Sequence, residues 1–96
     1  MQWASTVAVE IAHLGTDGVL HGHSLTIEAW TDQRTCLDAW KARLSSVADE
    51  MAGHLERTIG ARTFEDVGAF VLASLPECTR VIVRLPTRGH LVEVTR

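Results

Sequence analysis

Three histidines near the start of the chain have the residue type and spacing of metal ligands. His21 and His23 are separated by a single glycine, and His13 precedes them across a short chain reversal. Zinc takes nitrogen, oxygen or sulfur ligands at about 2.0–2.3 Å, and a catalytic zinc keeps one position open for water or substrate. Three imidazoles without a fourth protein ligand fit that description, so the spacing predicts an open zinc site.

The residues around these histidines are predicted to form one long antiparallel hairpin. Apolar side chains at odd positions alternate with small or polar ones from Trp3 to His13, as is typical of a strand. A second strand runs roughly from Val19 to Thr31. The segment from Gly15 to Gly18, with a glycine at each end, reverses the chain between the two strands.

The register of this hairpin decides whether the three histidines can share an ion. If the numbers of paired residues sum to about 34, His13 faces His21 and lies diagonal to His23 on the same face. Two histidines on one strand are more often an ordinary surface pair. The third histidine at the matching register favours zinc, because it brings three imidazoles within reach of one ion.

Two further residues are candidates for moving protons. Asp17 lies in the chain reversal, where it is either close to a bound ion or a turn aspartate bonded to its own backbone. His54 falls on or beside the apolar face of the first predicted helix, where the alternative to a functional role is a core-edge histidine bonded to backbone. His90, at the start of the last strand, carries no functional signal.

Two helices are predicted after the hairpin. Apolar residues recur every three or four positions from Leu37, which indicates an amphipathic helix capped by Thr35 and ending near Gly60. A second helix starts at Thr63, whose hydroxyl can cap the first turn, and stops before Pro76.

Two short strands end the chain, from about Cys78 to Leu85 and from His90 to Thr95. The order ββααββ predicts an α+β fold in which both helices cover one face of a four-stranded antiparallel sheet. The other face carries the even positions of the hairpin, which are too polar for a core and too poor in charge for a free surface. We expect that face to border a wet cavity or another subunit.

Length and composition bound the class of protein. The 96 residues suffice for one domain, residues 1–96. The net charge of −3 and the scattered basic residues argue against a nucleic-acid partner. No apolar run approaches the ~20 residues that span a bilayer, and the start lacks the features of a signal peptide, so we expect a cytoplasmic protein without membrane contact.

Taken in order, these features resemble the 6-pyruvoyltetrahydropterin synthase and 6-carboxytetrahydropterin synthase family in a shortened form. The resemblance rests on His13, Leu20-His21-Gly22-His23-Ser24, Gly53-His54, Thr63-Phe64-Glu65 and Val81-Ile82-Val83. It implies a tunnelling fold, in which subunits join sheet edge to sheet edge into a barrel with the helices outside, as a trimer or hexamer. It also implies that the three histidines hold Zn2+ and that the substrate is a pterin such as dihydroneopterin triphosphate.

The match to the family's remaining functional residues is partial. Asp17 stands at the place of the family's catalytic cysteine, and Leu85 at the place of a glutamate that anchors the pterin. Gly53 stands at the place of the aspartate in an aspartate-histidine pair, which leaves His54 without that partner. The resemblance implies that Asp17 and His54 move protons while the metal polarises oxygens of the substrate.

The leading hypothesis is a zinc-dependent lyase of this type, acting on a pterin or a related small hydroxylated substrate. The alternative is a non-catalytic tunnelling-fold oligomer that retains the zinc site without pterin turnover. A small binding module, in which the histidines line a pocket without metal, is the third hypothesis.

Overall fold

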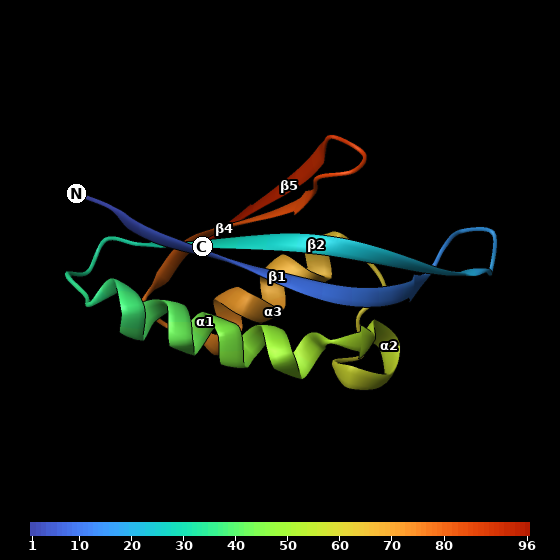
Figure 1. The fold of residues 1–96 in the computed structure, drawn as a ribbon, viewed down its shortest axis with the longest axis horizontal. Helices are drawn as coiled ribbons and strands as arrows, with labels where there is room; N and C mark the ends of the chain where they lie inside the picture. The colour runs from blue at the N-terminus through green and yellow to red at the C-terminus, as the bar shows by residue number, and fades with distance from the viewer.

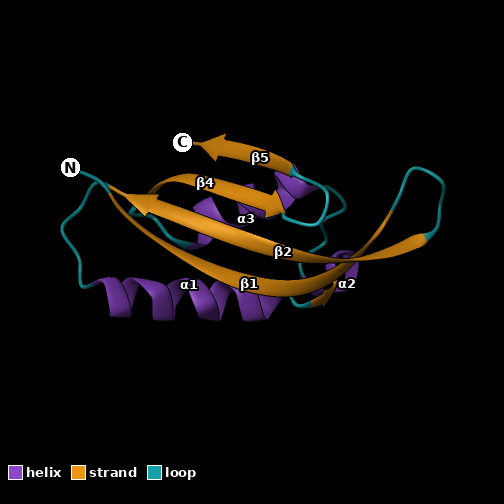
Figure 2. Cartoon of the chain, turned by 45° about the horizontal axis from the view of Figure 1, so that its top comes forward, coloured by secondary structure: helices purple, strands orange, loops and turns teal.

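Two strands of twelve residues, β1 (Trp3–Leu14) and β2 (Leu20–Thr31), form a long hairpin at the centre of the molecule. The structure is a computed structural model that describes all 96 residues. After the hairpin come α1 (Leu37–Met51), β3 (Gly53–His54), α2 (Leu55–Thr58), α3 (Phe64–Ser74), β4 (Cys78–Leu85) and β5 (His90–Thr95). The strands form one sheet in the order β3-β1-β2-β4-β5, and the helices lie on one of its faces (Figure 1 and Figure 2).

The register of the hairpin is the one in which the three histidines can meet. Trp3 pairs with Thr31 and Leu14 with Leu20, so the numbers of paired residues sum to 34 throughout. Side chains alternate between the two faces of a strand, which sends the odd-numbered residues toward the helices. Val9 and Ile27 on that face are 7% and 0% exposed. The predicted burial of the odd face is therefore confirmed.

Helices α1 and α3 close the core over this face. Their buried residues are Trp40, Leu44, Val47, Ala48 and Met51 in α1, and Val67, Gly68, Val71 and Leu72 in α3. The indole nitrogen of Trp40 donates to the carbonyl of Ala29 at 3.0 Å, so its polar atom is bonded inside the core. The predicted α+β arrangement, with the helices on one face of the sheet, is confirmed.

The first predicted helix is in fact interrupted. Helix α1 ends at Met51, and Gly53 has a φ of +94°, a backbone conformation that favours glycine. Residues 53 and 54 then pair in parallel with residues 11 and 12 of β1, which makes β3 a short fifth strand at the sheet edge. The apolar period continues across the break because Leu55, the first residue of α2, is also buried. The cap at Thr35 is likewise wrong, because Cys36 is the N-cap and no side chain bonds there.

The start of α3 follows the prediction. The Thr63 hydroxyl accepts a hydrogen bond from the backbone N–H of Asp66 at 3.1 Å. The Asp66 carboxylate accepts in return from the backbone N–H groups of Thr63 and Arg62, each at 3.3 Å. This reciprocal capping box orders the backbone just before the helix, including the carbonyl of Arg62.

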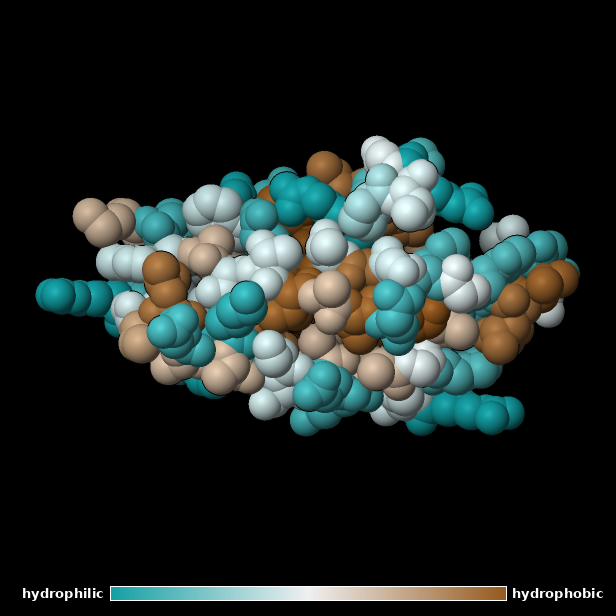
Figure 3. Space-filling view, in the orientation of Figure 1, coloured by the Kyte–Doolittle hydropathy of each residue, from teal (hydrophilic) through white to brown (hydrophobic).

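The other face of the sheet is polar and carries no helix. Arg84 forms an ion pair with Glu28 at 3.0 Å, and the Arg80 guanidinium lies over the ring of Trp30 at 4.4 Å. The hairpin extends past the helices at one end, where Val19 and Leu20 are 54% and 50% exposed. Apolar side chains gather over that end of the molecule (Figure 3). None of the helices is long and apolar enough to cross a membrane.

Candidate metal centre

The hairpin register brings the three predicted histidines together on one face. His13 pairs with His21, and His23 pairs with Ile11 two residues along the same strand. The ring centroid of His13 lies 6.2 Å from that of His21 and 5.0 Å from that of His23. His21 and His23 are 6.4 Å apart by the same measure. The predicted cluster therefore exists, at the edge of the core rather than within it.

Phe64, the first residue of α3, packs against the cluster. Its ring centroid lies 4.9 Å from that of His13 and 5.6 Å from that of His23, the latter edge to face. Burial lowers the pKa of His23, and the neighbouring imidazole of His13 lowers it further. A neutral imidazole at this position is the form that binds a metal ion.

His13 is held in one orientation and one tautomer. Its Nδ1 lies 3.1 Å from the carbonyl oxygen of Arg62, which can only accept, so Nδ1 carries the hydrogen and donates it. Its Nε2 therefore presents a lone pair, and this atom lies 3.1 Å from Nε2 of His23. Metal-binding histidines characteristically donate the second ring N–H to a carbonyl or carboxylate in this way.

His21 is engaged by Asp17 instead. The Nε2 of His21 donates to the Asp17 carboxylate at 3.1 Å, and the backbone N–H of Val19 donates to the same carboxylate at 2.9 Å. These bonds, the one from Val19 first, hold the pKa of Asp17 below its usual value. The aspartate is thus a turn residue bonded to its own backbone and also a neighbour of the histidine cluster.

Gly15 makes room for this contact. A Cβ atom at that position would lie 2.8 Å from Oδ1 of Asp17 and 2.8 Å from Cδ2 of His21. Neither approach is compatible with a real side chain, so a larger residue at position 15 would displace both groups. The glycine in the predicted reversal therefore also serves the site directly.

The donor set fits zinc in its chemistry and in part of its geometry. Two zinc ligands at about 2.0–2.1 Å, separated by a tetrahedral angle, lie about 3.3 Å apart, and the pair of Nε2 atoms of His13 and His23 is close to that spacing. The third imidazole is turned toward Asp17. No three histidine, cysteine, aspartate or glutamate side chains converge in a geometry that could hold an ion.

His54 lies apart from the three histidines. It belongs to β3, where it pairs with Ala12, and partners across neighbouring strands point to the same face. His54 is therefore placed on the side of Ala12 and not on that of His13. Its Nδ1 is buried and has no hydrogen-bond partner. The predicted position on the first helix is wrong because that helix ends at Met51.

A cavity of about 270 Å³ opens beside the histidines. Its lining residues are His13, His21, His23, Phe64, Leu85, Arg88 and His90. Arg88 and His90 come from the turn after β4 and the start of β5, and neither was predicted to belong to the site. The adjacency of β2 and β4 brings them there, and no local pattern in the sequence reports that adjacency.

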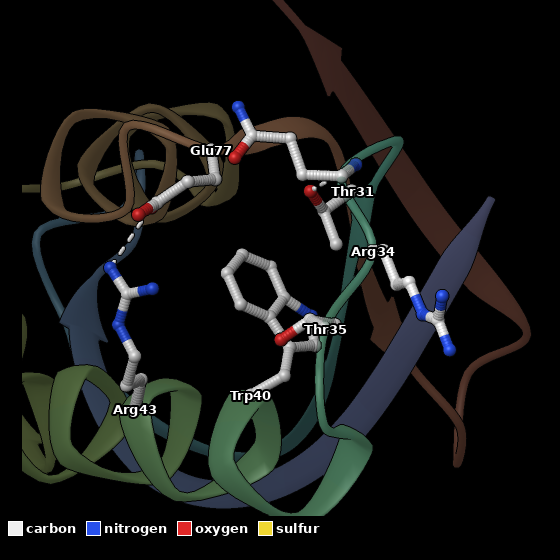
Figure 4. Close-up of a pocket in the computed structure, with 7 residues that line it drawn as sticks. Thr31, Arg34, Thr35, Trp40, Arg43 and Glu77 are labelled. Carbon is white, nitrogen blue, oxygen red and sulfur yellow. Dashed lines mark hydrogen bonds and ion pairs between the residues drawn. The ribbon is translucent and has the colours of Figure 1, made fainter.

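A second cavity, of about 160 Å³, lies beside the start of α1 (Figure 4). Arg43 and Glu77 form an ion pair across it at 2.9 Å, and the Trp40 ring lies beside them. The guanidinium of Arg34 points away from this pair. The main polar groups here bond to one another, so we do not assign this cavity as the functional site.

Comparisons with known proteins identify the fold. No family model matches the chain, and no curated protein matches it. A solved structure of Caenorhabditis elegans 6-pyruvoyl tetrahydropterin synthase is similar, with a TM-score of 0.82 and 13% sequence identity. The similarity covers 100% of this chain and 95% of the other. At this identity the likeness carries the fold alone, and it confirms that the chain adopts the tunnelling fold of 6-pyruvoyl tetrahydropterin synthase.

Proposed function

We propose that the chain binds zinc through His13, His21 and His23 and uses it in a lyase or proton-transfer reaction on a small hydroxylated substrate. A pterin, as in the similar synthase, is one member of that class. The observation that carries the proposal is the state of His13. Its Nδ1–H donates to the Arg62 carbonyl, so its Nε2 presents a lone pair to the cluster and accepts a hydrogen bond from Nε2 of His23 at 3.1 Å.

The chain's own groups have distinct tasks in this proposal. When bound, zinc would polarise a substrate oxygen and so acidify the neighbouring proton. Asp17, ionised at neutral pH, bonds to His21 in the metal-free protein and would be released when that imidazole turned to zinc, so Asp17 is the proposed proton acceptor. His54 is the proposed second proton carrier, and its place on the opposite face requires that a neighbouring subunit bring it to the site. Assembly into a trimeric or hexameric barrel is thus part of the proposal. A reducing, cytoplasmic location is also part of it, and the two free cysteines support that location.

Metal analysis of untagged protein tests the zinc claim. We expect close to one zinc per chain by plasma mass spectrometry, and less than about one-third of a zinc per chain would contradict the claim. His13→Ala should lose the metal. His54→Ala is the matched control, because it removes an imidazole outside the cluster and should leave the zinc content unchanged.

Product analysis tests the lyase claim separately. If the substrate is a pterin, incubation with dihydroneopterin triphosphate should yield a chromatographically shifted pterin, and Asp17→Ala should abolish the product while zinc stays bound. Absence of turnover with full zinc occupancy would count against that substrate.

The second candidate function is a non-catalytic tunnelling-fold oligomer that keeps zinc. Leu85 favours it, because this residue lines the cavity at 4% exposure and offers no acceptor to a pterin. A large loss of melting temperature in His13→Ala, with no shift in wild-type protein on adding pterins or purines, would favour this function over the lyase.

A further inference from the structure

Arg88 faces the histidine cavity without an acidic partner. Of the eight arginines, Arg43, Arg62, Arg80 and Arg84 pair with carboxylates, and Arg96 bonds to main-chain carbonyls. Arg88 makes neither kind of contact, although its backbone N–H donates to the Leu85 carbonyl at 3.0 Å and so orders the turn. Its guanidinium is therefore available to a ligand, on the wall of the cavity that holds the histidines.

The cavity has an excess of positive charge once zinc is present. Four histidines and Arg88 line it, together with Phe64 and Leu85, and none of the lining residues is acidic. Three neutral imidazoles and the one nearby carboxylate, that of Asp17, leave the charge of a divalent ion only partly compensated, and Arg88 adds another positive charge nearby. In a partly desolvated site such charges attract an anion strongly.

The remaining walls restrict the body of that anion. Phe64 and Leu85 present carbon atoms only, so a heterocycle rich in N–H donors would lose its water there and gain no acceptor. A compact molecule with a short apolar part fits this restriction.

We propose that the histidine cavity binds a small oxyanion, a carboxylate or a phosphate on a short body, with Arg88 as its counter-charge and specificity-determining residue. This inference rests on the proposed zinc function and narrows its substrate class away from pterins. A planar guanidinium can grip either oxyanion with two parallel hydrogen bonds.

Calorimetric titration of the zinc-loaded protein tests the assignment. The probes are lactate, inorganic phosphate and neopterin at constant ionic strength. Lactate and phosphate should bind, the tighter of the two identifying the oxyanion, and neopterin should bind at least about tenfold more weakly. Arg88→Gln should weaken oxyanion binding by about tenfold or more, and Arg88→Lys by less, because it keeps the charge. Arg57→Gln, which removes another unpaired and exposed arginine, should leave binding unchanged.

Three results would overturn the proposal: equal oxyanion affinity in wild-type protein and Arg88→Gln, no binding of either oxyanion, or tighter binding of neopterin. Zinc content measured on the same samples distinguishes failure of oxyanion binding from failure of the proposed zinc function. If no zinc loads, the proposed function fails, while titration of the metal-free protein still tests Arg88. The backbone turn, and not the metal, positions Arg88. The metal-free protein should therefore bind the oxyanion more weakly but still in an Arg88-dependent way.

Discussion

The cavity beside α1 and the cavity beside the histidines differ in where their polar groups find partners. In the first, Arg43 bonds to Glu77 and the Trp40 indole bonds to the Ala29 carbonyl. In the second, Nε2 of His13 bonds to Nε2 of His23, and Arg88 has no acidic partner. Groups bonded to carboxylates or main-chain carbonyls contribute to stability, whereas two ring nitrogens bonded to each other and an unpaired guanidinium can serve a ligand. The bonding state of the lining groups, more than the presence of a cavity, therefore marks a site.

Trp40→Ala gives the largest expected effect and tests the structural role of the first cavity. Removing this 1% exposed side chain should lower the free energy of unfolding by about 3–5 kcal/mol, because it leaves a void in the core. Urea unfolding of metal-free protein measures the loss. His23→Ala should lower the free energy of unfolding much less under the same conditions. Arg43→Gln, which breaks a half-exposed ion pair, should lower it by at most about 1 kcal/mol. Equal losses of unfolding free energy in Trp40→Ala and His23→Ala would contradict the difference between the two cavities.

Zinc should stabilise the protein through the second cavity alone. A free concentration of 100 times the dissociation constant should add about 2.7 kcal/mol to the free energy of unfolding. Thermal unfolding with and without a chelator measures this difference. His13→Ala should abolish the zinc-dependent shift, and Arg43→Gln should retain it. A chelator-insensitive wild type would favour the binding module without metal.

Thr63→Ala tests whether the helix cap supports the metal centre. Loss of the hydroxyl should cost about 1 kcal/mol of stability, since the N–H of Asp66 loses its acceptor. It should also weaken zinc binding by up to about tenfold, because the capping box orders the Arg62 carbonyl that orients His13. Thr63→Ser keeps the acceptor and should retain both properties. Competition with a chromophoric chelator measures the zinc affinity. An unchanged affinity in Thr63→Ala would show that the helix cap does not support zinc binding.

The smallest expected effect is the pH dependence contributed by Asp66. Hydrogen bonds from the backbone N–H of Arg62, the Thr63 hydroxyl and the Thr63 N–H hold its pKa below the ordinary value of 3.8. The folded state therefore gains stability from the ionised carboxylate above pH 3.8, and loses it as the pH falls through the lower folded pKa. Asp66→Asn should flatten the acid limb of the stability curve. Asp32→Asn, in a loop outside the capping box, should leave that limb unchanged, and identical curves for wild type and Asp66→Asn would contradict this reason.

Local patterns predicted most of the fold because they concern neighbours in the chain. Alternation and the Gly15 to Gly18 reversal predicted the hairpin and its buried face, and the observed register meets the stated condition for His13, His21 and His23 to lie together. Alternation also predicted β4 and β5 with their observed ends. The break after Met51 could not be predicted, because the buried side chain of Leu55 continues the helical period across it.

The sequence alone was enough to place the three histidines on one face, because side chains alternate with period two and a slip of one residue would expose the apolar residues. What surrounds the histidines depends on the tertiary structure. The Arg62 carbonyl that selects the tautomer of His13 is 49 residues away along the chain. Arg88 and His90 reach the cavity because β4 pairs with β2. Contacts at that separation depend on how sheet and helices pack, and the packing is a property of the whole core that no local pattern records.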